Sequence, residues 1–585
     1  MSEKTEQDKP AVANSSQEPV EKRLRLWPAL LILLLHFVAA LGFWFLGSTN
    51  IHNAVALGVV PIVAALLLII WWLTASRAPW RYRLLGLALF IAALAEIVFA
   101  QEFLNYGLML LAYAMPTMTT GIVILLTATY PVRWRLRRIV LALYIVACAG
   151  VFTAMRVDSI AGNLSPVASW RWKPTAKDLS EAIPRSEAHG TAVLPVQAGP
   201  GDWPAFRGAA RDGRLAGTKF AADWSTPPRE LWRRKIGPAW SSFAVIGDYL
   251  FTQEQRGEDE LVTCYRTDTG EEVWVNRVEA RFEDAMGLGP RATPTFDNGK
   301  LYTQGGTGFL QCLDASTGNT IWKRNIATDA ETGVPGWGFV SSPLIAGEYV
   351  VQFSAGGEGK NVLAYNRASG EVVWRAGHGS GGYSSPHFAR IENVPQVLMV
   401  GNWGLQALAL ETGNLLWDNA WSVSQNPRCT QPLLIDNDLV MFGTTGKMGS
   451  RLLRVRKNEA AWDVKQEWET NKFRPYFNDC VLHKGYVYGF DGDRCACIDV
   501  KTGERQWEGK RYDGQVLLIA DMDLFLVLSE AGEVALVDAT PQKFNERARF
   551  KALEGKTWNH PVIAYGRLFV RNAKEAACFE LPLLP

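Results

Sequence analysis

A short phrase recurs five times between residues 264 and 507, and it limits what this chain can fold into. Each copy places Ala or Cys ten positions before a Trp, with Thr-Gly or Ser-Gly in between. We interpret each copy as two antiparallel strands joined by a tight turn, in which Gly supplies the positive φ. The small residue suits a crowded strand face, and the Trp buries a large ring. The five copies are Cys264–Trp274, Cys312–Trp322, Ala364–Trp374, Ala407–Trp417 and Cys497–Trp507.

Further apolar strands extend this repeat to eight units. Their first strands start 37 to 51 residues apart, a spacing typical of propeller blades. The seventh unit has Phe550 in place of Trp, and the eighth stops without a fourth strand. Glu230–Lys235 precedes the first complete unit, and pairing it with the last unit would close the ring and remove its exposed edges. The prediction is an all-β eight-bladed propeller of four-stranded antiparallel blades, closed by an N-terminal strand.

Seven tryptophans are expected to dock each blade against the next one. A Trp at the end of the fourth strand buries a large aromatic area, which suits the contact between two packed sheets. We assign these residues a structural role: Trp232, Trp274, Trp322, Trp374, Trp417, Trp468 and Trp507.

Five apolar stretches precede the propeller, and most reach the roughly 20 residues that a helix needs to cross a bilayer. They predict an α-helical membrane domain of five spans: Trp27–Leu46, Ala54–Leu73, Leu84–Ala100, Leu108–Thr129 and Ile139–Met155. Basic residues occur before the first stretch, after the second and after the fourth, whereas the connections 47–53 and 101–107 carry none. This alternation indicates a cytoplasmic N-terminus and a periplasmic propeller, held at a bacterial inner membrane by contacts with lipid.

Two ionisable residues, His36 and Glu96, lie within these apolar stretches. Ionisable groups are costly in lipid and are candidates for function. The alternative is that each pairs with a neighbour inside the helical bundle or lies near a membrane interface.

The resulting domain organisation has four parts. Residues 1–25 are polar and are expected to form a disordered cytoplasmic tail, and residues 26–155 form the membrane domain. Residues 156–200 mix Pro, Ser, Ala and charges without a period and are interpreted as a linker, and residues 201–585 form the propeller.

Composition excludes several functions. The 60 basic and 58 acidic residues nearly balance and no long like-charge run occurs, so nothing indicates a nucleic-acid partner. Eight cysteines are too few for a disulfide framework, and none has zinc-site spacing. Four of them, Cys264, Cys312, Cys497 and Cys578, are assigned to the small-residue position of the repeat, and Cys429 and Cys480 are the only pair worth testing for a disulfide.

The repeated phrase, with Thr-Gly before a terminal Trp, resembles the quinoprotein (PQQ-type) propeller repeat over about residues 202–585. Two families share it. The PQQ-dependent dehydrogenases include the membrane-bound glucose dehydrogenases, which are similar in having five N-terminal spans and a segment comparable to Trp203-Pro204-Ala205-Phe206. The BamB-like propellers of outer-membrane barrel assembly carry no cofactor and act as binding scaffolds.

Departures from the dehydrogenase pattern favour the second family. The propeller is compact, and no adjacent cysteines occur. PQQ chemistry also requires Ca²⁺ held by oxygen ligands beside an Asp base, and no family-like set of Glu, Asn and Asp could be assigned. The chain is therefore interpreted as a non-catalytic binding or scaffold module for a periplasmic protein or a small ligand, with no cofactor assigned. The alternative is a compact dehydrogenase that uses PQQ with calcium, oxidises an alcohol or sugar and passes electrons to membrane quinone.

One set of residues at or just before the first strands is expected to converge on one opening of the central channel, which we call the mouth. Arginines and aromatic side chains there could bind an anionic or planar ligand by bidentate hydrogen bonds and stacking. The alternative is that they plug the channel and pack the loops. The set consists of Trp240, Arg291, Trp337, Tyr383, Arg428, Arg474, Tyr476, Trp558, Asn559 and His560.

Overall fold

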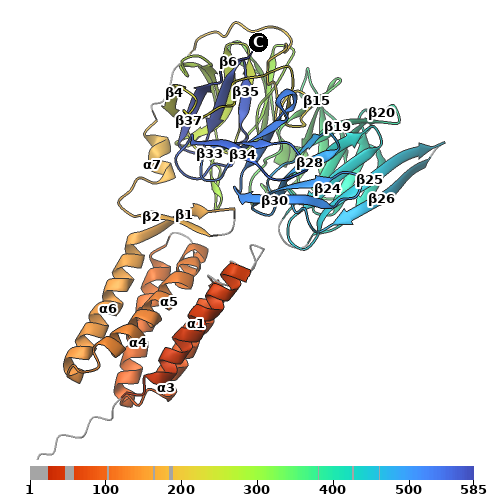
Figure 1. Cartoon of the computed structure of the whole chain (residues 1–585). Helices are drawn as coiled ribbons and strands as arrows, with labels where there is room; N and C mark the ends of the chain where they lie inside the picture. The colour runs from red at the N-terminus through yellow and green to blue at the C-terminus, as the bar shows by residue number, and fades with distance from the viewer. Residues whose placement is uncertain are drawn as a thin grey trace, which may run out of the picture. The chain divides into compact units, whose positions relative to one another are not determined.

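The computed structural model describes residues 24–46, 58–101, 104–162, 165–183, 189–379, 381–423, 427–459 and 461–584 (Figure 1). The chain divides into two compact units, Met1–Arg156 and Val157–Pro585. Of the tail expected at residues 1–25, all but residues 24 and 25 lie outside the described ranges.

The N-terminal unit is helical. Among the described helices, α4, α5 and α6 are long and apolar enough to cross a membrane. The bounds of the five helices are α1 (Trp27–Leu46), α3 (Val60–Thr74), α4 (Trp80–Phe99), α5 (Leu104–Ala128) and α6 (Trp134–Ala154).

The expectation of five spans is therefore corrected to three candidate spans among the described residues. The other two helices have shorter apolar segments. These segments are Trp27–Phe43 within α1 and Val60–Thr74, which is α3. The 15 residues of α3 extend for about 22 Å, less than the roughly 30 Å of a bilayer core. The expected second span began at Ala54, and residues 54–57 lie outside the described ranges.

Two arginines of the basic connections bind the ends of preceding helices. Arg83 donates from Nη1 to the carbonyl of Leu73 in the last turn of α3 (2.5 Å) and from Nε to that of Ala78 in the following connection (2.7 Å). Arg137 donates from Nη2 to the carbonyl of Leu126 (2.6 Å). The last carbonyls of a helix have no partner within it, so these guanidinium groups satisfy polar atoms that would otherwise be left bare.

The two ionisable residues of the apolar stretches make different contacts. The ring of His36 stacks on Phe37 with centroids 4.9 Å apart. Glu96 is exposed on α4, and no ion pair to it occurs in the part of the chain described. The expected pairing inside the bundle is therefore not seen for Glu96.

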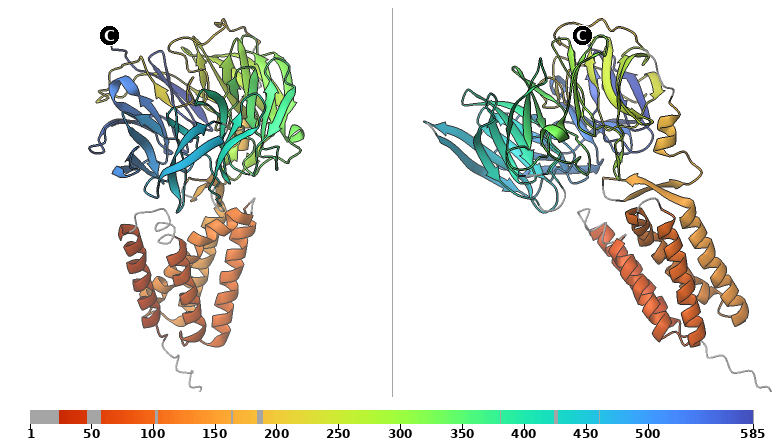
Figure 2. Two further views of the ribbon diagram at one scale, coloured as in Figure 1. Left: turned by 90° about the vertical axis from the view of Figure 1, so that its right-hand side faces the viewer. Right: turned by 180° about the vertical axis from the view of Figure 1, so that it is seen from behind.

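The second unit is a ring of eight antiparallel blades, numbered here in chain order (Figures 1 and 2). Blades one to four consist of β5 (Ala244–Ile246), β6 (Tyr249–Arg256), β7 (Asp259–Arg266) and β8 (Glu272–Glu279); β11 (Thr295–Asp297), β12 (Lys300–Gln304), β13 (Phe309–Asp314) and β14 (Thr320–Asn325); β15 (Leu344–Ala346), β16 (Tyr349–Phe353), β17 (Val362–Asn366) and β18 (Val372–Ala376); and β19 (His387–Ile391), β20 (Val394–Gly401), β21 (Gly404–Ala409) and β22 (Leu415–Ala420).

Blades five to seven consist of β23 (Leu433–Asp436), β24 (Leu439–Thr444), β25 (Gly449–Asn458) and β26 (Ala461–Thr470); β27 (Val481–His483), β28 (Tyr486–Asp491), β29 (Arg494–Asp499) and β30 (Arg505–Arg511); and β31 (Gln515–Ile519), β32 (Leu524–Leu528), β33 (Glu533–Asp538) and β34 (Glu546–Lys551). Blade eight takes β35 (Val562–Ala564), β36 (Arg567–Arg571) and β37 (Glu575–Glu580) from the C-terminus and β4 (Glu230–Lys235) from the start of the propeller.

The ring closes through the pairing of β4 with β37, which lie side by side in Figure 1. Cys578 faces Trp232 across this pair, as Ala or Cys faces Trp in the other regular blades. The prediction of eight four-stranded blades closed by an N-terminal strand is confirmed. A two-residue strand, β3 (Arg214–Leu215), adds to the inner edge of blade seven in parallel with β31.

At six of the eight junctions, the tryptophan of the fourth strand joins its blade to the next one through one hydrogen bond. The indole Nε1 of the fourth-strand Trp donates to a backbone carbonyl at the third strand's end in the following blade. These bonds join Trp232 to Thr267 (2.9 Å), Trp274 to Ala315 (3.1 Å), Trp322 to Arg367 (3.0 Å), Trp374 to Leu410 (3.0 Å), Trp468 to Val500 (2.7 Å) and Trp507 to Thr540 (2.7 Å).

The phrase's glycine lies against the same ring. A Cβ on Gly318 would come within 2.5 Å of the Trp274 ring, and a Cβ on Gly370 within 2.6 Å of Trp322. Both glycines also have a φ above +70°. Gly is thus required twice, by the turn and by the tryptophan that packs on it.

Two junctions depart from this arrangement. The fifth blade lacks the Thr-Gly turn, and Trp417 donates instead to Gln396 Oε1 of its own blade (2.7 Å). In the seventh blade Phe550 packs edge-on against Trp224 and Phe579 at 5.4 and 5.0 Å between centroids.

The stretch expected as a linker, 156–200, carries short elements of its own. A hairpin of β1 (Met155–Ile160) and β2 (Pro166–Trp170) is followed by α7 (Ala176–Glu181), which begins with a capping box at Thr175. The backbone N–H of Ala192 then donates to the carbonyl of Ser316 (2.8 Å), so the segment returns along the outside of blades one and two.

We predict that Gly318→Ala destabilises the propeller by about 1–3 kcal/mol, because the new methyl overlaps the Trp274 ring. Gly347→Ala is the matched control, since Gly347 also has a positive φ but has no atom within 4 Å of the Cβ position. The midpoints of thermal unfolding compare the two. Equal losses would mean that the backbone conformation, and not the Trp contact, accounts for the cost.

Candidate functional site

A belt of hydrogen bonds runs around the propeller axis where the first strands begin. In each of the first six blades a backbone N–H donates to a polar side chain of the next blade. These bonds run from Ser242 to Thr293 Oγ1 (3.0 Å), Thr293 to Ser342 Oγ (2.9 Å), Ser342 to Ser385 Oγ (2.9 Å), Ser385 to Gln431 Oε1 (3.2 Å), Gln431 to Asp479 Oδ1 (2.7 Å) and Asp479 to Gln515 Oε1 (3.4 Å).

The belt closes through blade eight. Gln515 Nε2 donates to the carbonyl of Trp558 (3.4 Å), and Ser242 Oγ donates to the carbonyl of His560 (2.6 Å). Each buried N–H of the belt has a partner, which removes a cost of roughly 1–3 kcal/mol for every group left unpaired. The belt holds the starts of all eight first strands in one register.

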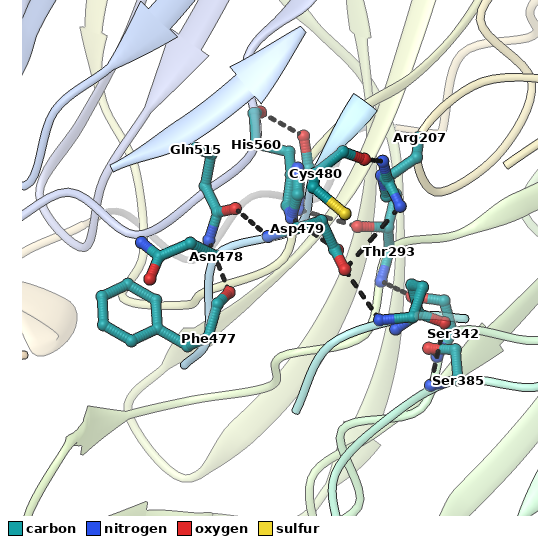
Figure 3. A network of polar contacts seen from close by, with 12 residues as sticks. Arg207, Thr293, Ser342, Ser385, Phe477, Asn478, Asp479, Cys480, Gln515 and His560 are labelled. Carbon is teal, nitrogen blue, oxygen red and sulfur yellow. Dashed lines mark hydrogen bonds and ion pairs between the residues drawn. The ribbon is translucent and has the colours of Figure 1, made fainter. Parts of the chain in front are cut away.

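Residues 202–213, which we call the plug segment, cross this belt. Trp203 bridges to Val245 of blade one, and Arg211 donates to the carbonyls of Ser342 (3.1 Å) and Pro343 (2.9 Å) before blade three. Arg207 donates to the carbonyl of Cys480 before blade six (2.5 Å; Figure 3). Contacts with blades on different sides of the ring show that the plug segment passes through its centre.

A buried charge cluster lies where the plug segment meets blades six and eight (Figure 3). Arg207 Nη1 is 3.7 Å from Asp479 Oδ1, and His560 Nε2 is 3.6 Å from Asp479 Oδ2. Burial raises the pKa of Asp479, and the Arg207 charge opposes this rise. Burial, together with Arg207, holds the pKa of His560 well below its usual value, so the imidazole is neutral.

Next to the plug segment lies a cavity of about 170 Å³ on the propeller axis, which we call the axial cavity. Phe206 of the plug segment lines it and packs edge-on against His560 at 4.9 Å between centroids. Aromatic side chains dominate its wall, including the stacked pair Trp337 and Tyr383, whose centroids are 4.7 Å apart. The cavity is smaller than the roughly 300–1,000 Å³ typical of pockets for drug-sized ligands.

The structure brings seven of the ten predicted mouth residues to this cavity. They are Trp240, Arg291, Trp337, Tyr383, Tyr476, Trp558 and His560. Whether they bind a ligand stays a prediction.

The other three predicted residues make structural contacts. Arg428 is buried and donates to the carbonyls of Gly401, Asn402 and Trp421. Arg474 forms a bidentate pair with Asp491 (2.5 and 2.8 Å). Asn559 donates to the carbonyl of Ser241 (2.6 Å) and thereby continues the belt. For these three, position at the start of a first strand was a poor guide, because the side chain turns away from the axis: Arg428 into the preceding blade, Arg474 into its own blade and Asn559 toward the next blade.

The charges that line the axial cavity are compensated. Arg291 Nη2 is 2.7 Å from Asp284 Oδ1, and Asp479 is engaged by Arg207. The expectation of an anionic ligand, which rested on three arginines, is therefore weakened: a single arginine lines the cavity, and it already has a carboxylate.

The same lining does not fit calcium-bound PQQ. Ca²⁺ takes six to eight oxygen ligands, usually with several carboxylates, and Asp479 is the only carboxylate among the lining residues. No group of three or more His, Cys, Asp or Glu side chains able to hold a metal occurs within the described ranges. The described lining residues therefore do not supply the metal site that PQQ chemistry requires.

Sequence reasoning missed two charged residues at the rim of the cavity, Lys556 and Glu530. Lys556 Nζ lies 4.9 Å from the ring centroid of Trp240 and 4.2 Å from that of Trp558, a cation–π contact on both sides. Burial lowers the pKa of Lys556 to about 7. Glu530 Oε1 accepts from Trp558 Nε1 (2.8 Å). Lys556 lies two positions before Trp558, which was itself a predicted mouth residue. This closeness in sequence was the signal by which Lys556 could have been found.

All eight cysteines are free thiols. Cys429 lines the axial cavity, and burial raises its pKa to about 12. The possibility of a Cys429–Cys480 disulfide is therefore not realised in this structure.

The repeat, the closed ring and the axial cavity can now be set beside known proteins. The family described as outer membrane protein assembly factor BamB matches residues 226–358 and 306–546, which together cover more than half of the chain. The chain belongs to this family. No curated protein matches the sequence.

Solved structures similar to this BamB-family chain include a BamB and an alcohol dehydrogenase. BamB from Moraxella catarrhalis is 16% identical, with 60% of this chain and 99% of that chain covered and a TM-score of 0.46. Quinohemoprotein alcohol dehydrogenase from Comamonas testosteroni is 14% identical, with 69% and 83% covered and a TM-score of 0.48. At these values neither similarity decides the function.

We predict that Asp479→Ala lowers the free energy of unfolding by about 3 kcal/mol, because it leaves Arg207 buried without a carboxylate. Glu580→Ala is the matched control: it breaks the exposed Arg229–Glu580 pair (2.8 Å), which solvent screens, so its effect on the free energy of unfolding should be much smaller. Urea unfolding followed by tryptophan fluorescence measures both. Similar costs for the two variants would show that the buried cluster contributes no more than a surface pair.

Proposed function

We propose that this BamB-family chain is a membrane-anchored, non-catalytic binding module whose ligand site is the axial cavity. The observation that carries this proposal is the convergence of aromatic side chains from several blades on one cavity inside a closed ring. Rigid aromatic rings provide a large contact area at a small cost in conformational entropy, which suits a recognition site. A scaffold that is tied together around its whole circumference keeps those rings in place without a ligand.

The compensated charges indicate the kind of ligand. With Arg291 paired to Asp284, and Asp479 to Arg207, a ligand gains little from carrying a charge of its own. Stacking surfaces and polar groups of the belt remain available to it. We therefore propose a neutral ligand, or a neutral part of a protein partner, that offers an apolar or aromatic group and hydrogen-bonding atoms.

The helical unit supplies the anchor in this proposal. The basic connections support a cytoplasmic N-terminus at a bacterial inner membrane. Three crossings, like five, are an odd number, so α4, α5 and α6 would still deliver the propeller to the periplasmic side. Contacts with lipid are then made by the exposed apolar side chains of these helices.

The competing function is a compact PQQ-dependent dehydrogenase that passes electrons to membrane quinone, with His36 or Glu96 near the quinone. Its support is the propeller repeat that the family shares with quinoproteins. The small cavity and its single carboxylate argue against it.

Site-specific photo-crosslinking tests the proposed site. The photoreactive residue p-benzoylphenylalanine in place of Trp337 should form an adduct in intact host membranes, because this position lines the axial cavity. The matched control replaces Val373, which is 47% exposed on β18. The adduct should also weaken in a Tyr383→Ala background, which removes the stacking partner of position 337. Equal labelling from both positions, or none from position 337, would contradict an axial binding site.

Titration with PQQ and Ca²⁺ separates the two functions. The full-length protein in detergent is expected to show no saturable quenching of tryptophan fluorescence and no dye-linked oxidation of an alcohol or glucose. Stoichiometric quenching together with oxidation would establish the dehydrogenase and end the scaffold proposal.

A further inference from the structure

The tip of the β1–β2 hairpin, Ile160–Gly162, occupies the rim of the axial cavity. Ala161 and Gly162 are among the residues that line the cavity. The tip lies in the same compact unit as the propeller, although it belongs to the stretch expected to be a linker.

The propeller holds this tip through backbone atoms. Lys556 Nζ donates to the carbonyl of Ile160 (3.0 Å), and Glu530 Oε1 accepts from the N–H of Gly162 (2.8 Å). The carbonyl of Ala285 accepts from the N–H of Ile160 (3.0 Å). Lys556, Glu530 and the Ala285 carbonyl thus form hydrogen bonds with main-chain N–H and C=O groups of the tip. A peptide of another sequence has the same main-chain groups.

At Gly162 the space beside the tip is limited by the ring of Phe477. A Cβ on Gly162 would lie 2.8 Å from Cε1 and 2.9 Å from Cζ of Phe477. The φ of Gly162 is not in the left-handed region, so the exclusion of other residues comes from Phe477 and not from the backbone. The rim therefore selects glycine where the main chain passes over this ring.

A further polar group at the same place lacks a partner. Trp240 lines the cavity, and its Nε1 is buried with no acceptor among the residues that the structure describes. An unpaired buried donor is costly, and a ligand carbonyl would satisfy it.

We propose that the rim of the axial cavity is a binding site for a glycine-containing peptide segment of a partner protein, and that the chain's own hairpin tip occupies this site until such a segment displaces it. This inference rests on the proposed binding function and specifies its ligand. The partner's main chain takes the contacts of Ile160–Gly162 with Lys556, Glu530 and Phe477. Its neighbouring apolar or aromatic side chain enters the cavity, and one of its carbonyls accepts from Trp240.

The test uses the full-length protein in detergent and a fluorescein-labelled peptide of residues 155–170, which carries the hairpin sequence. Gly162→Val in the protein should expel the tip, because the new side chain overlaps Phe477. The amides of the tip should then exchange with solvent about tenfold faster or more. Ala168→Val is the matched control, since Ala168 is exposed in the same hairpin.

The emptied rim should bind the labelled peptide at least about tenfold more tightly than the wild-type protein or the Ala168→Val variant, as measured by fluorescence anisotropy. A peptide that itself carries Gly162→Val should not bind. Adding Lys556→Met and Glu530→Gln to the opened protein should abolish binding.

Each other result overturns the inference. If Gly162→Val leaves amide exchange unchanged, the tip is not held by the contact with Phe477. If the opened protein does not bind the peptide, or binds the valine peptide equally well, the rim does not recognise a peptide through its glycine. Equal binding by wild type and opened protein would mean that the tip does not compete. None of these results removes the axial binding site, which the cross-linking from position 337 tests separately.

Discussion

The contact between a tryptophan and the glycine turn of the next blade is the interaction on which the rest of this structure depends. A four-stranded sheet alone leaves two faces exposed, and the indole covers one of them while its N–H satisfies a carbonyl of the neighbouring blade. The same contact recurs at six of the eight junctions, and the one between Trp232 and Thr267 closes the ring from a strand that precedes the first complete blade. Closure therefore fixes the N-terminal strand as part of the last blade.

A closed ring has a centre that must be filled, and this chain fills it in two ways. The belt of polar side chains satisfies the N–H groups at the starts of the first strands, and the plug segment brings Arg207 and Arg211 into the space that remains. Such buried guanidinium groups need carbonyl or carboxylate partners, which the blades supply. The axial cavity is what is left beside the plug segment, and its aromatic wall follows from the residues that each blade places just before its first strand.

The rim of this cavity differs from its wall in how it can recognise a ligand. The wall offers rings, whereas Lys556 and Glu530 offer a matched donor and acceptor at the edge. The hairpin tip uses both, so the segment that follows α6 in the chain is itself a ligand of the propeller. In the arrangement that we propose, the hairpin tip covers the rim of this compact propeller until a partner segment competes for the same contacts.

The repeat by itself determined the eight blades, their strand order and the closing role of Glu230–Lys235, because the Trp and Gly positions follow a period that only one architecture satisfies. Hydropathy predicted five spans where the described residues contain three candidate spans, since an apolar stretch does not show where its helix begins or ends. Tertiary structure decided the site. Seven of ten predicted mouth residues reach the axial cavity, but Arg428 and Arg474 bind backbone carbonyls and a carboxylate elsewhere. Lys556 and Glu530 lie in connections of blades eight and seven, and the hairpin tip that they bind lies outside the repeat altogether. The periodic pattern specifies where backbones run, whereas the direction of a long side chain and the docking of an irregular segment depend on contacts between residues far apart in the sequence.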